Sequence, residues 1–408
     1  MKTRGAWGLS LLAACAGDAG KPTTDDAPAP VAVAEVCADG TWSGWDSPDG
    51  LVFVDPAGSD TTGDGSLVAP YQTLQQALRG TMGEGEIHIA LGAGTYQGPV
   101  SLLQGPGGVS LTVQGCGPDE TAFTHDLGQS AAADIAIAGS TPVTLARLRI
   151  EDPDGAGVVV RKGANATVEH VRITGARGTG VAAIGEGTRA TFRDVAILDG
   201  RGGHTLRGWG VLGTHAQLTL EDVTVQSVTS MGVYQRGGTL DATRLSVQGT
   251  AATGQGRRGF GIHAFEAEKV GLTDCQVQEV YGAGVLLVNV PTAALTRVQV
   301  DQVQANETGG GDGILLARRF WEGPLSATLT DNTVTRAARM GIALAGVDAT
   351  LSGNTAGADN GTVVDGRSLF SDGVGVVAGD AVAAFDRDTD WILQAYAHRD
   401  PGPFNRIP

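Results

Sequence analysis

The chain has 408 residues, of which 63 are Gly, 41% are hydrophobic and 5% are aromatic, and its formal net charge is −16. This hydrophobic content excludes a disordered chain, the lack of a Gly-X-Y period excludes collagen, and the acidic balance argues against nucleic-acid binding. We therefore expect one large all-β unit with many short strands and tight turns.

The first fifteen residues, MKTRGAWGLSLLAAC, are predicted to be a targeting segment and not part of the fold. Lys2 and Arg4 precede a short apolar run, and Leu12–Cys15 resembles a bacterial lipobox. This resemblance implies lipidation of Cys15, with an ordinary secretory signal as the alternative. We expect an exported protein attached to the membrane by the lipid anchor alone, because no other run is long enough to span a bilayer.

Residues 16–50 are predicted to be a flexible tether and N-terminal segment, since 16–35 are small, acidic and contain Pro. An Asp directly after the lipobox Cys would indicate retention in the inner membrane. Here that position is Ala16, so we expect the lipid anchor to lie in the outer membrane. Of three further cysteines, Cys275 lies at an apolar repeat position and is predicted to be buried. Cys37 and Cys116 could form a disulfide, which the sequence alone leaves open.

Residues 51–80, LVFVDPAGSDTTGDGSLVAPYQTLQQALRG, are predicted to form a strand, a loop containing Gly and Asp, and a short helix. The helix is expected over Pro70–Arg79. We expect it to close the N-terminal end of the repetitive fold that follows, because the first rung would otherwise present unpaired strand edges.

Three apolar positions then recur with the spacing a, a+3, a+5 in nine copies. The copies are Leu145/Leu148/Ile150, Val168/Val171/Ile173, Phe192/Val195/Ile197, Leu220/Val223/Val225, Ala242/Leu245/Val247, Leu272/Cys275/Val277, Leu295/Val298/Val300, Leu329/Asn332/Val334 and Leu351/Asn354/Ala356. The first eight are each followed by a Gly before Val or Ile, at Gly157, Gly180, Gly210, Gly232, Gly261, Gly284, Gly313 and Gly341. Copies 22 to 34 residues apart indicate a solenoid.

The pairs V-x-I and V-x-V are rich in β-branched residues, which predicts short strands. A leucine-rich repeat is the rival at this period, but its Asn or Cys position and helical return are missing. We therefore predict a right-handed parallel β-helix over residues 51–356, with Asn332 and Asn354 stacked as an internal ladder. Residues 357–408 are predicted to form the last rung and a C-terminal cap.

The opening segment and the repeats together resemble the pectin-lyase-like superfamily over about residues 50–356. The opening pattern is a strand, G-x-D, a Gly and P-x-x-T-x-x-x-A. It is carried by Gly58, Asp60, Gly63, Pro70, Thr73 and Ala77, and IHIALGAGTYQGPVSL continues it. The resemblance implies a β-helix in a bacterial lipoprotein. It also implies that the loop holding Asp60 and Asp64 is structural, so we expect no metal there.

The repeat is interrupted at one position. The first apolar position of each copy, called its first anchor, is followed by the repeat Gly after 12 residues in five copies, and after 18 or 19 in three alternate copies. The extra residues fall in 198–209, 248–260 and 301–312. Since strands on adjacent rungs lie about 4.8 Å apart, these loops should project in a row at intervals of about 10 Å. Loops on a rigid scaffold are common binding sites.

The first two loops are basic, and the second residue after each repeat Gly is predicted to point outward beside them. The candidate ligand-binding residues are His204, Arg207, Trp209, Tyr234, Arg236, Arg257, Arg258 and His263. Planar rings with Arg suit an anionic sugar or another acidic ligand. The alternative is that the Arg side chains are solvated loop charges and that Tyr234 and His263 only cover the coil.

Catalytic residues are not assigned, because acidic residues do not accompany the basic ones along the sequence. Asp199 is alone in the first loop, and Asp301, Glu307 and Asp312 lie in another. We expect a monomeric, non-enzymatic lipoprotein that binds a polysaccharide or a cell-envelope partner and needs no cofactor. The alternatives are a divergent polysaccharide lyase or glycoside hydrolase, with Ca²⁺ only in the lyase case, and a purely structural envelope element.

Overall fold

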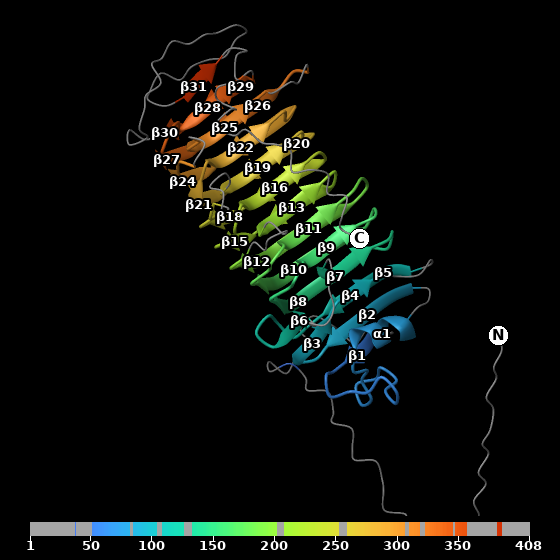
Figure 1. The fold of residues 1–408 in the computed structure, drawn as a ribbon. Helices are drawn as coiled ribbons and strands as arrows, with labels where there is room; N and C mark the ends of the chain where they lie inside the picture. Colours follow the sequence, from blue (N-terminus) through green and yellow to red (C-terminus); the bar gives the residue numbers. More distant parts are fainter. Residues whose placement is uncertain are drawn as a thin grey trace, which may run out of the picture. The chain divides into compact units, whose positions relative to one another are not determined.

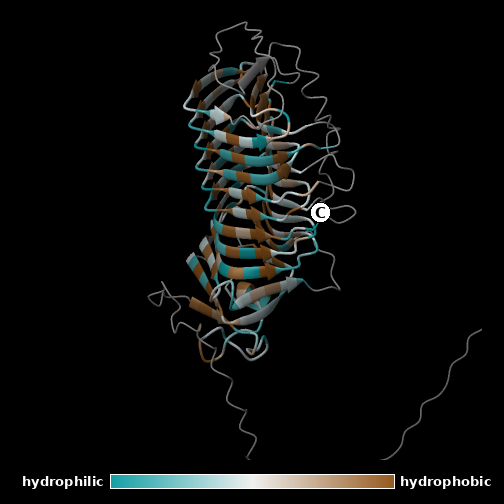
Figure 2. Ribbon diagram, turned by 90° about the vertical axis from the view of Figure 1, so that its left-hand side faces the viewer, coloured by the Kyte–Doolittle hydropathy of each residue, from teal (hydrophilic) through white to brown (hydrophobic). Residues whose placement is uncertain are grey.

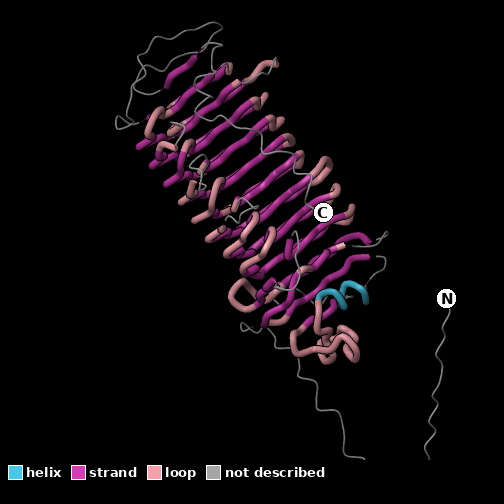
Figure 3. Tube along the Cα trace, viewed as in Figure 1, coloured by secondary structure: helices cyan, strands magenta, loops and turns pink. Residues whose placement is uncertain are grey.

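The computed structural model describes residues 37, 51–81, 85–103, 108–125, 133–201, 208–252, 259–306, 310–318, 323–345, 347–356 and 382–385. They belong to one unit, Ala32–Pro408, in which the chain winds into a coil of stacked parallel strands (Figure 1). Figure 3 shows the helix of the described residues at the end of the coil where the first strand lies. The predicted parallel β-helix is confirmed.

Each rung contributes to three rows of strands. The first row contains β1 (Leu51–Val54), β2 (Gly85–Leu91), β5 (Gly108–Gln114), β8 (Val143–Glu151), β10 (Asn165–Thr174), β12 (Arg189–Leu198), β14 (Gln217–Glu221), β17 (Thr239–Thr243), β20 (Lys269–Thr273), β23 (Thr292–Thr296), β26 (Ser326–Thr330) and β29 (Asp348–Ser352). The second row contains β3 (Gly94–Gly98), β6 (Thr121–His125), the second halves of β8, β10 and β12, β15 (Thr224–Gln226), β18 (Ser246–Gln248), β21 (Gln276–Tyr281), β24 (Gln299–Gln304), β27 (Thr333–Ala337) and β30 (Thr355–Ala356). The third row contains β4 (Val100–Leu102), β7 (Ala133–Ala138), β9 (Ala156–Arg161), β11 (Thr179–Ile184), β13 (Trp209–Thr214), β16 (Met231–Arg236), β19 (Phe260–Phe265), β22 (Ala283–Val288), β25 (Asp312–Ala317), β28 (Ile342–Ala345) and β31 (Val382–Phe385).

The repeated apolar positions stack in register, as predicted. Val168 pairs with Leu145 on one side and Phe192 on the other, and all three side chains are fully buried. The same register continues along the coil and forms one core. Figure 2 shows the accompanying alternation of hydrophobic and hydrophilic residues along the strands. Burying one such aliphatic or Phe side chain stabilises a fold by about 1.5–3 kcal/mol, so the stacked positions are the main source of stability.

The coil turns at residues with left-handed backbone angles, which the sequence analysis missed. The first corner, two residues after each first anchor, contains Arg147, His170, Asp194, Asp222, Arg244, Asp274, Arg297 and Asp331, with φ between 49° and 58°. The second corner, five residues further on, includes Asp152, Asp199, Ser227, Glu279, Gln302 and Arg336. Because this conformation disfavours β-branched residues, polar side chains occupy the corners and face solvent.

Two carboxylates of the first corner are paired with arginines of the next rung. Arg244 donates to both oxygens of Asp222 at 2.5 and 2.7 Å, and Arg297 donates to both oxygens of Asp274 at 2.5 and 2.8 Å. These hydrogen bonds hold the pKa of Asp222 and the pKa of Asp274 below their ordinary value of 3.8. All four side chains are partly exposed, so salt should weaken the pairs.

We expect the free energy of unfolding to depend less on pH under acidic conditions when Arg244→Gln and Arg297→Gln are combined. A carboxyl pKa that is lowered by folding contributes stability above its unfolded value, and this contribution is lost as the pH falls toward the folded value. Urea midpoints measured between about pH 5 and pH 2 should therefore fall less steeply in the variant. Arg189→Gln is the control, because Arg189 donates to Gln217 and not to a carboxylate. An unchanged slope in the double variant would contradict the prediction.

The N-terminal end is closed by α1 (Leu74–Gly80), which starts four residues later than predicted. It begins late because Thr73 is its N-cap, with a side chain that accepts a hydrogen bond from the amide of Gln76. The Asp60 carboxylate accepts hydrogen bonds from the amides of Gln72 and Thr73 at 2.9 Å. The loop that contains Asp60 is therefore a structural support for the helix.

Two further local predictions are confirmed. Asn332 donates to the side-chain oxygen of Asn354 at 2.7 Å, and Asn354 donates to the carbonyl of Leu329, so the amides form the predicted ladder. Cys275 is buried, and burial raises the pKa of its thiol to about 11. Cys15 and the cap expected over 357–408 lie outside the described residues, apart from β31.

Cys37 and Cys116 form a disulfide, one of the alternatives that the sequence leaves open. Cys116 lies in the turn between β5 and β6, so the bond attaches residue 37 to the rung formed by β5, β6 and β7. Within the described part of the chain, no helix is long and apolar enough to cross a membrane.

Candidate functional site

The three insertions leave the coil at the same corner. They connect β12 to β13, β18 to β19 and β24 to β25, and in each case the chain passes from the second row to the third row. These connections lie on alternate rungs. Residues 202–207, 253–258 and 307–309 lie outside the described residues, and with them His204, Arg207, Arg257 and Arg258. The ligand-binding role of these four stays a prediction.

Trp209, Tyr234 and His263 form a continuous stack on the outer face of the third row. The ring centroids of Trp209 and Tyr234 are 5.3 Å apart, and those of Tyr234 and His263 are 5.2 Å apart. Tyr234 belongs to an apolar cluster separate from the core of the coil, so it points outward as predicted. The three residues are only 2%, 2% and 4% exposed, however. In this structure they pack against neighbours and offer almost no surface to a ligand.

Arg236 lies apart from this stack. It ends β16, whereas the insertions enter the third row at the beginning of the strands. Its guanidinium lies 5.8 Å from the centre of the Phe265 ring, a distance at which a cation is attracted by the ring face. The structure therefore brings together Trp209, Tyr234 and His263 among the candidate residues, and places Arg236 near the other end of the same strands.

The two described acidic residues of the third insertion, Asp301 and Asp312, are paired with arginines that the sequence analysis did not associate with them. Arg336 donates to Asp301 at 2.8 Å, and Thr335 donates to the same carboxylate at 2.6 Å. Arg339 binds Asp312 with two hydrogen bonds, one of them at 2.8 Å, and Asp312 is fully buried. Each carboxylate is neutralised by the following rung, so these residues stabilise the corner.

An open cavity lies where the first insertion leaves the coil. It has a volume of about 390 Å³ and is lined by Asp199, Gly200, Arg201, Ser227 and Thr229. Asp199 and Ser227 are corresponding second-corner residues on adjacent rungs, with φ of 54° and 55°. The Thr229 hydroxyl donates to the carbonyl of Gly200 at 3.3 Å and fixes one wall. The residues that line the cavity thus include an Asp, an Arg, a Ser and a Thr at the loop-bearing corner.

The sequence analysis found only half of this cavity. Asp199 was noted as the lone acidic residue of the first insertion, and Arg201 lies in the same basic loop, whereas Ser227 and Thr229 belong to an ordinary copy of the repeat. The first anchors of these two copies lie 28 residues apart in the sequence. Asp199 and Ser227 are also 28 residues apart, so this spacing could have indicated that they occupy equivalent positions on adjacent rungs.

The described residues do not fit a metal site. Nowhere among them do three or more His, Cys, Asp or Glu side chains gather in a way that could hold a metal ion.

Comparisons with known proteins agree with the architecture. The family described as a right handed beta helix region matches residues 133–356. This chain belongs to that family. The match begins at β7 and covers the rungs that carry the three insertions, so both the outward stack and the open cavity lie on the family's own scaffold.

Solved structures with a similar fold include pectate lyase Pel9A, with a TM-score of 0.50 and 14% identity over 76% of this chain and 78% of that chain. A rhamnogalacturonan lyase has a TM-score of 0.35 and 12% identity, covering 75% and 87% of the two chains. The catalytic domain of an alpha-1,3-glucanase in complex with tetrasaccharides has a TM-score of 0.37 and 11% identity, covering 70% and 63%. A search of curated proteins gave no match. These likenesses concern the fold, since the identities are low.

Proposed function

We propose that this β-helix protein binds a polysaccharide at its loop-bearing corner. The observation that carries the proposal is the open cavity of about 390 Å³ lined by Asp199, Arg201, Ser227 and Thr229. Hydroxyls and a carboxylate suit sugar hydroxyl groups, and the Arg201 guanidinium suits the carboxylate of a sugar acid. The stacked rows beneath the cavity hold these groups on a rigid scaffold, which limits the entropy lost on binding.

The proposal includes export to the cell envelope through a lipid anchor on Cys15. The Cys37–Cys116 disulfide supports an oxidising compartment, because cytosolic thiols are kept reduced. A tether before residue 37 would leave the coil free to reach an envelope polysaccharide. Labelling with a fatty-acid analogue should be lost in Cys15→Ser, and retention of label in that variant would contradict the anchor.

Arg201→Ala is expected to weaken binding to an acidic polysaccharide about tenfold or more, because it removes a charge-assisted hydrogen bond. Retention on a panel of uronic and neutral polysaccharides measures this. Arg189→Ala is the matched control, since it removes the same charge from an exposed residue of β12 in the first row. The proposal fails if the wild-type protein is not retained on any polysaccharide, or if the two variants bind equally.

A second candidate function is cleavage of the polysaccharide as a divergent lyase or hydrolase. The observation that favours it is that the Asp199 carboxylate and the Arg201 guanidinium line one cavity, an acidic and a basic group within one site. The fold shared with pectate lyase Pel9A is compatible with it. Release of new chain ends by the wild-type protein, with or without calcium, and its loss in Asp199→Asn would support cleavage. Binding without release would leave the first function.

A further inference from the structure

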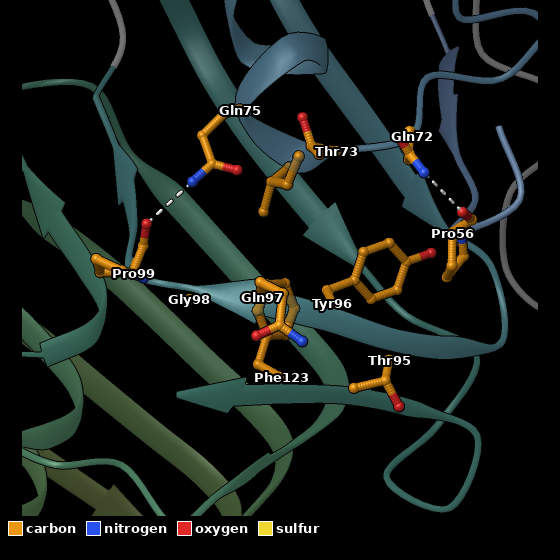
Figure 4. Close-up of a pocket in the computed structure, with 11 residues that line it drawn as sticks. Pro56, Gln72, Thr73, Gln75, Thr95, Tyr96, Gln97, Gly98, Pro99 and Phe123 are labelled. Atoms are coloured by element: carbon orange, nitrogen blue, oxygen red, sulfur yellow. Dashed lines mark hydrogen bonds between the residues drawn. The ribbon is translucent and has the colours of Figure 1, made fainter. Parts of the chain in front are cut away.

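A second cavity lies at the N-terminal end of the coil, beside the start of α1 (Figure 4). Its volume is about 320 Å³, and it lies between the segment that leads into α1 and the strand β3. Amide and hydroxyl side chains supply its polar groups: Gln72, Thr73, Gln75, Thr95 and Gln97. None of the described residues that line it carries a charge.

The amide groups of this cavity have a defined orientation. The side-chain nitrogen of Gln75 donates to the carbonyl of Pro99 at 3.0 Å, and that of Gln72 donates to the carbonyl of Pro56 at 3.3 Å (Figure 4). Only the nitrogen of an amide can donate to a carbonyl, so these bonds identify the other end of each amide as the oxygen. Both oxygens keep their capacity to accept hydrogen bonds from a ligand.

The walls of the cavity are held in place before any ligand binds. The rings of Tyr96 and Phe123 stack with centroids 5.5 Å apart, and both side chains are buried. The Tyr96 hydroxyl donates to the carbonyl of Val54 at 3.0 Å, and the Thr73 hydroxyl donates to the Asp60 carboxylate at 2.6 Å. A preorganised site loses less entropy when it binds a ligand.

We propose that this N-terminal cavity binds a neutral ligand rich in hydroxyl groups, of the size of one uncharged sugar residue. Amide oxygens match hydroxyl donors, whereas an anion would find no cation among the described lining residues and would lie near the Asp60 carboxylate that Thr73 binds. The volume is at the lower end of the range of about 300–1,000 Å³ for small-molecule sites. The site is independent of the charged cavity at the loop-bearing corner.

Saturation-transfer NMR on the full chain tests the proposal, with the methyl glycosides of glucose, galactose and mannose as probes and glucuronate as the charged counterpart. We expect transfer to at least one glycoside at millimolar concentration and weaker transfer to glucuronate. Gln97→Leu and Thr95→Val should each weaken binding about fivefold, the effect of one lost hydrogen bond. Both residues are exposed, so the variants should stay folded, which urea midpoints check.

Gln276→Leu is the matched control, an exposed Gln on β21 far along the second row, and should bind like the wild type. Arg201→Ala should bind the glycoside as the wild type does, because Arg201 does not line this cavity. Loss of polysaccharide binding at the loop-bearing corner would therefore not count against the N-terminal cavity. No transfer to any of the three glycosides would overturn the proposal. Unchanged binding in both Gln97→Leu and Thr95→Val, or equal binding of glucuronate, would overturn it as well.

Discussion

Replacement of Gly261 by Ala is expected to lower the free energy of unfolding by about 3 kcal/mol, near the upper end of the usual cost of overpacking. A Cβ atom at this position would lie 2.3 Å from Cγ1 of Val277 and 2.5 Å from the carbonyl oxygen of Gly284. The Val277 side chain is packed in the core, and the Gly284 carbonyl belongs to the backbone of the next rung. Neither group can move without disturbing the stacked strands.

Gly271→Ala is the matched control for this prediction. Gly271 also lies in a strand, β20. The atom nearest to a Cβ at this position would be the side-chain oxygen of Asp241 at 3.0 Å, which is the end of a flexible group. The Ala at 271 should be neutral or slightly stabilising, because it reduces the entropy of the unfolded chain. Urea unfolding followed by circular dichroism compares the two variants. Equal stability would show that the repeat Gly is not required by packing.

Removal of the disulfide with Cys37→Ala and Cys116→Ala is expected to cost about 2–5 kcal/mol. The bond closes a loop of chain with a sequence separation of 79, and closing a long loop restricts the unfolded state strongly. Both cysteines are buried, so the bond also anchors residue 37 to the turn before β6. The urea midpoint should fall by a corresponding amount.

Reducing agent provides the control. It should destabilise the wild-type protein and Cys275→Ala alike, because Cys275 is a free thiol, and it should leave the double variant unchanged. A wild-type midpoint that does not respond to full reduction would contradict a stabilising role for the bond.

The candidate site shows how far the sequence reaches. The three insertions could be placed at one corner because they lengthen the same part of three copies of the repeat. The outward direction of Tyr234 also followed, since neighbouring strand residues point to opposite faces. Its burial did not follow, and neither did the pairing of Asp312 with Arg339, because both depend on what the folded chain places next to these side chains.

The sequence by itself determined the coil and its register. Apolar triplets such as Val168, Val171 and Ile173 recur at one spacing, and only the stacking of successive copies buries all of them, so local pattern and tertiary structure coincide there. The tertiary structure decided which polar groups meet. Asp199 and Ser227 are brought to one cavity by the fold, and Gln75 and Gln97 to another, since positions far apart in the chain become neighbours only after the rungs have stacked.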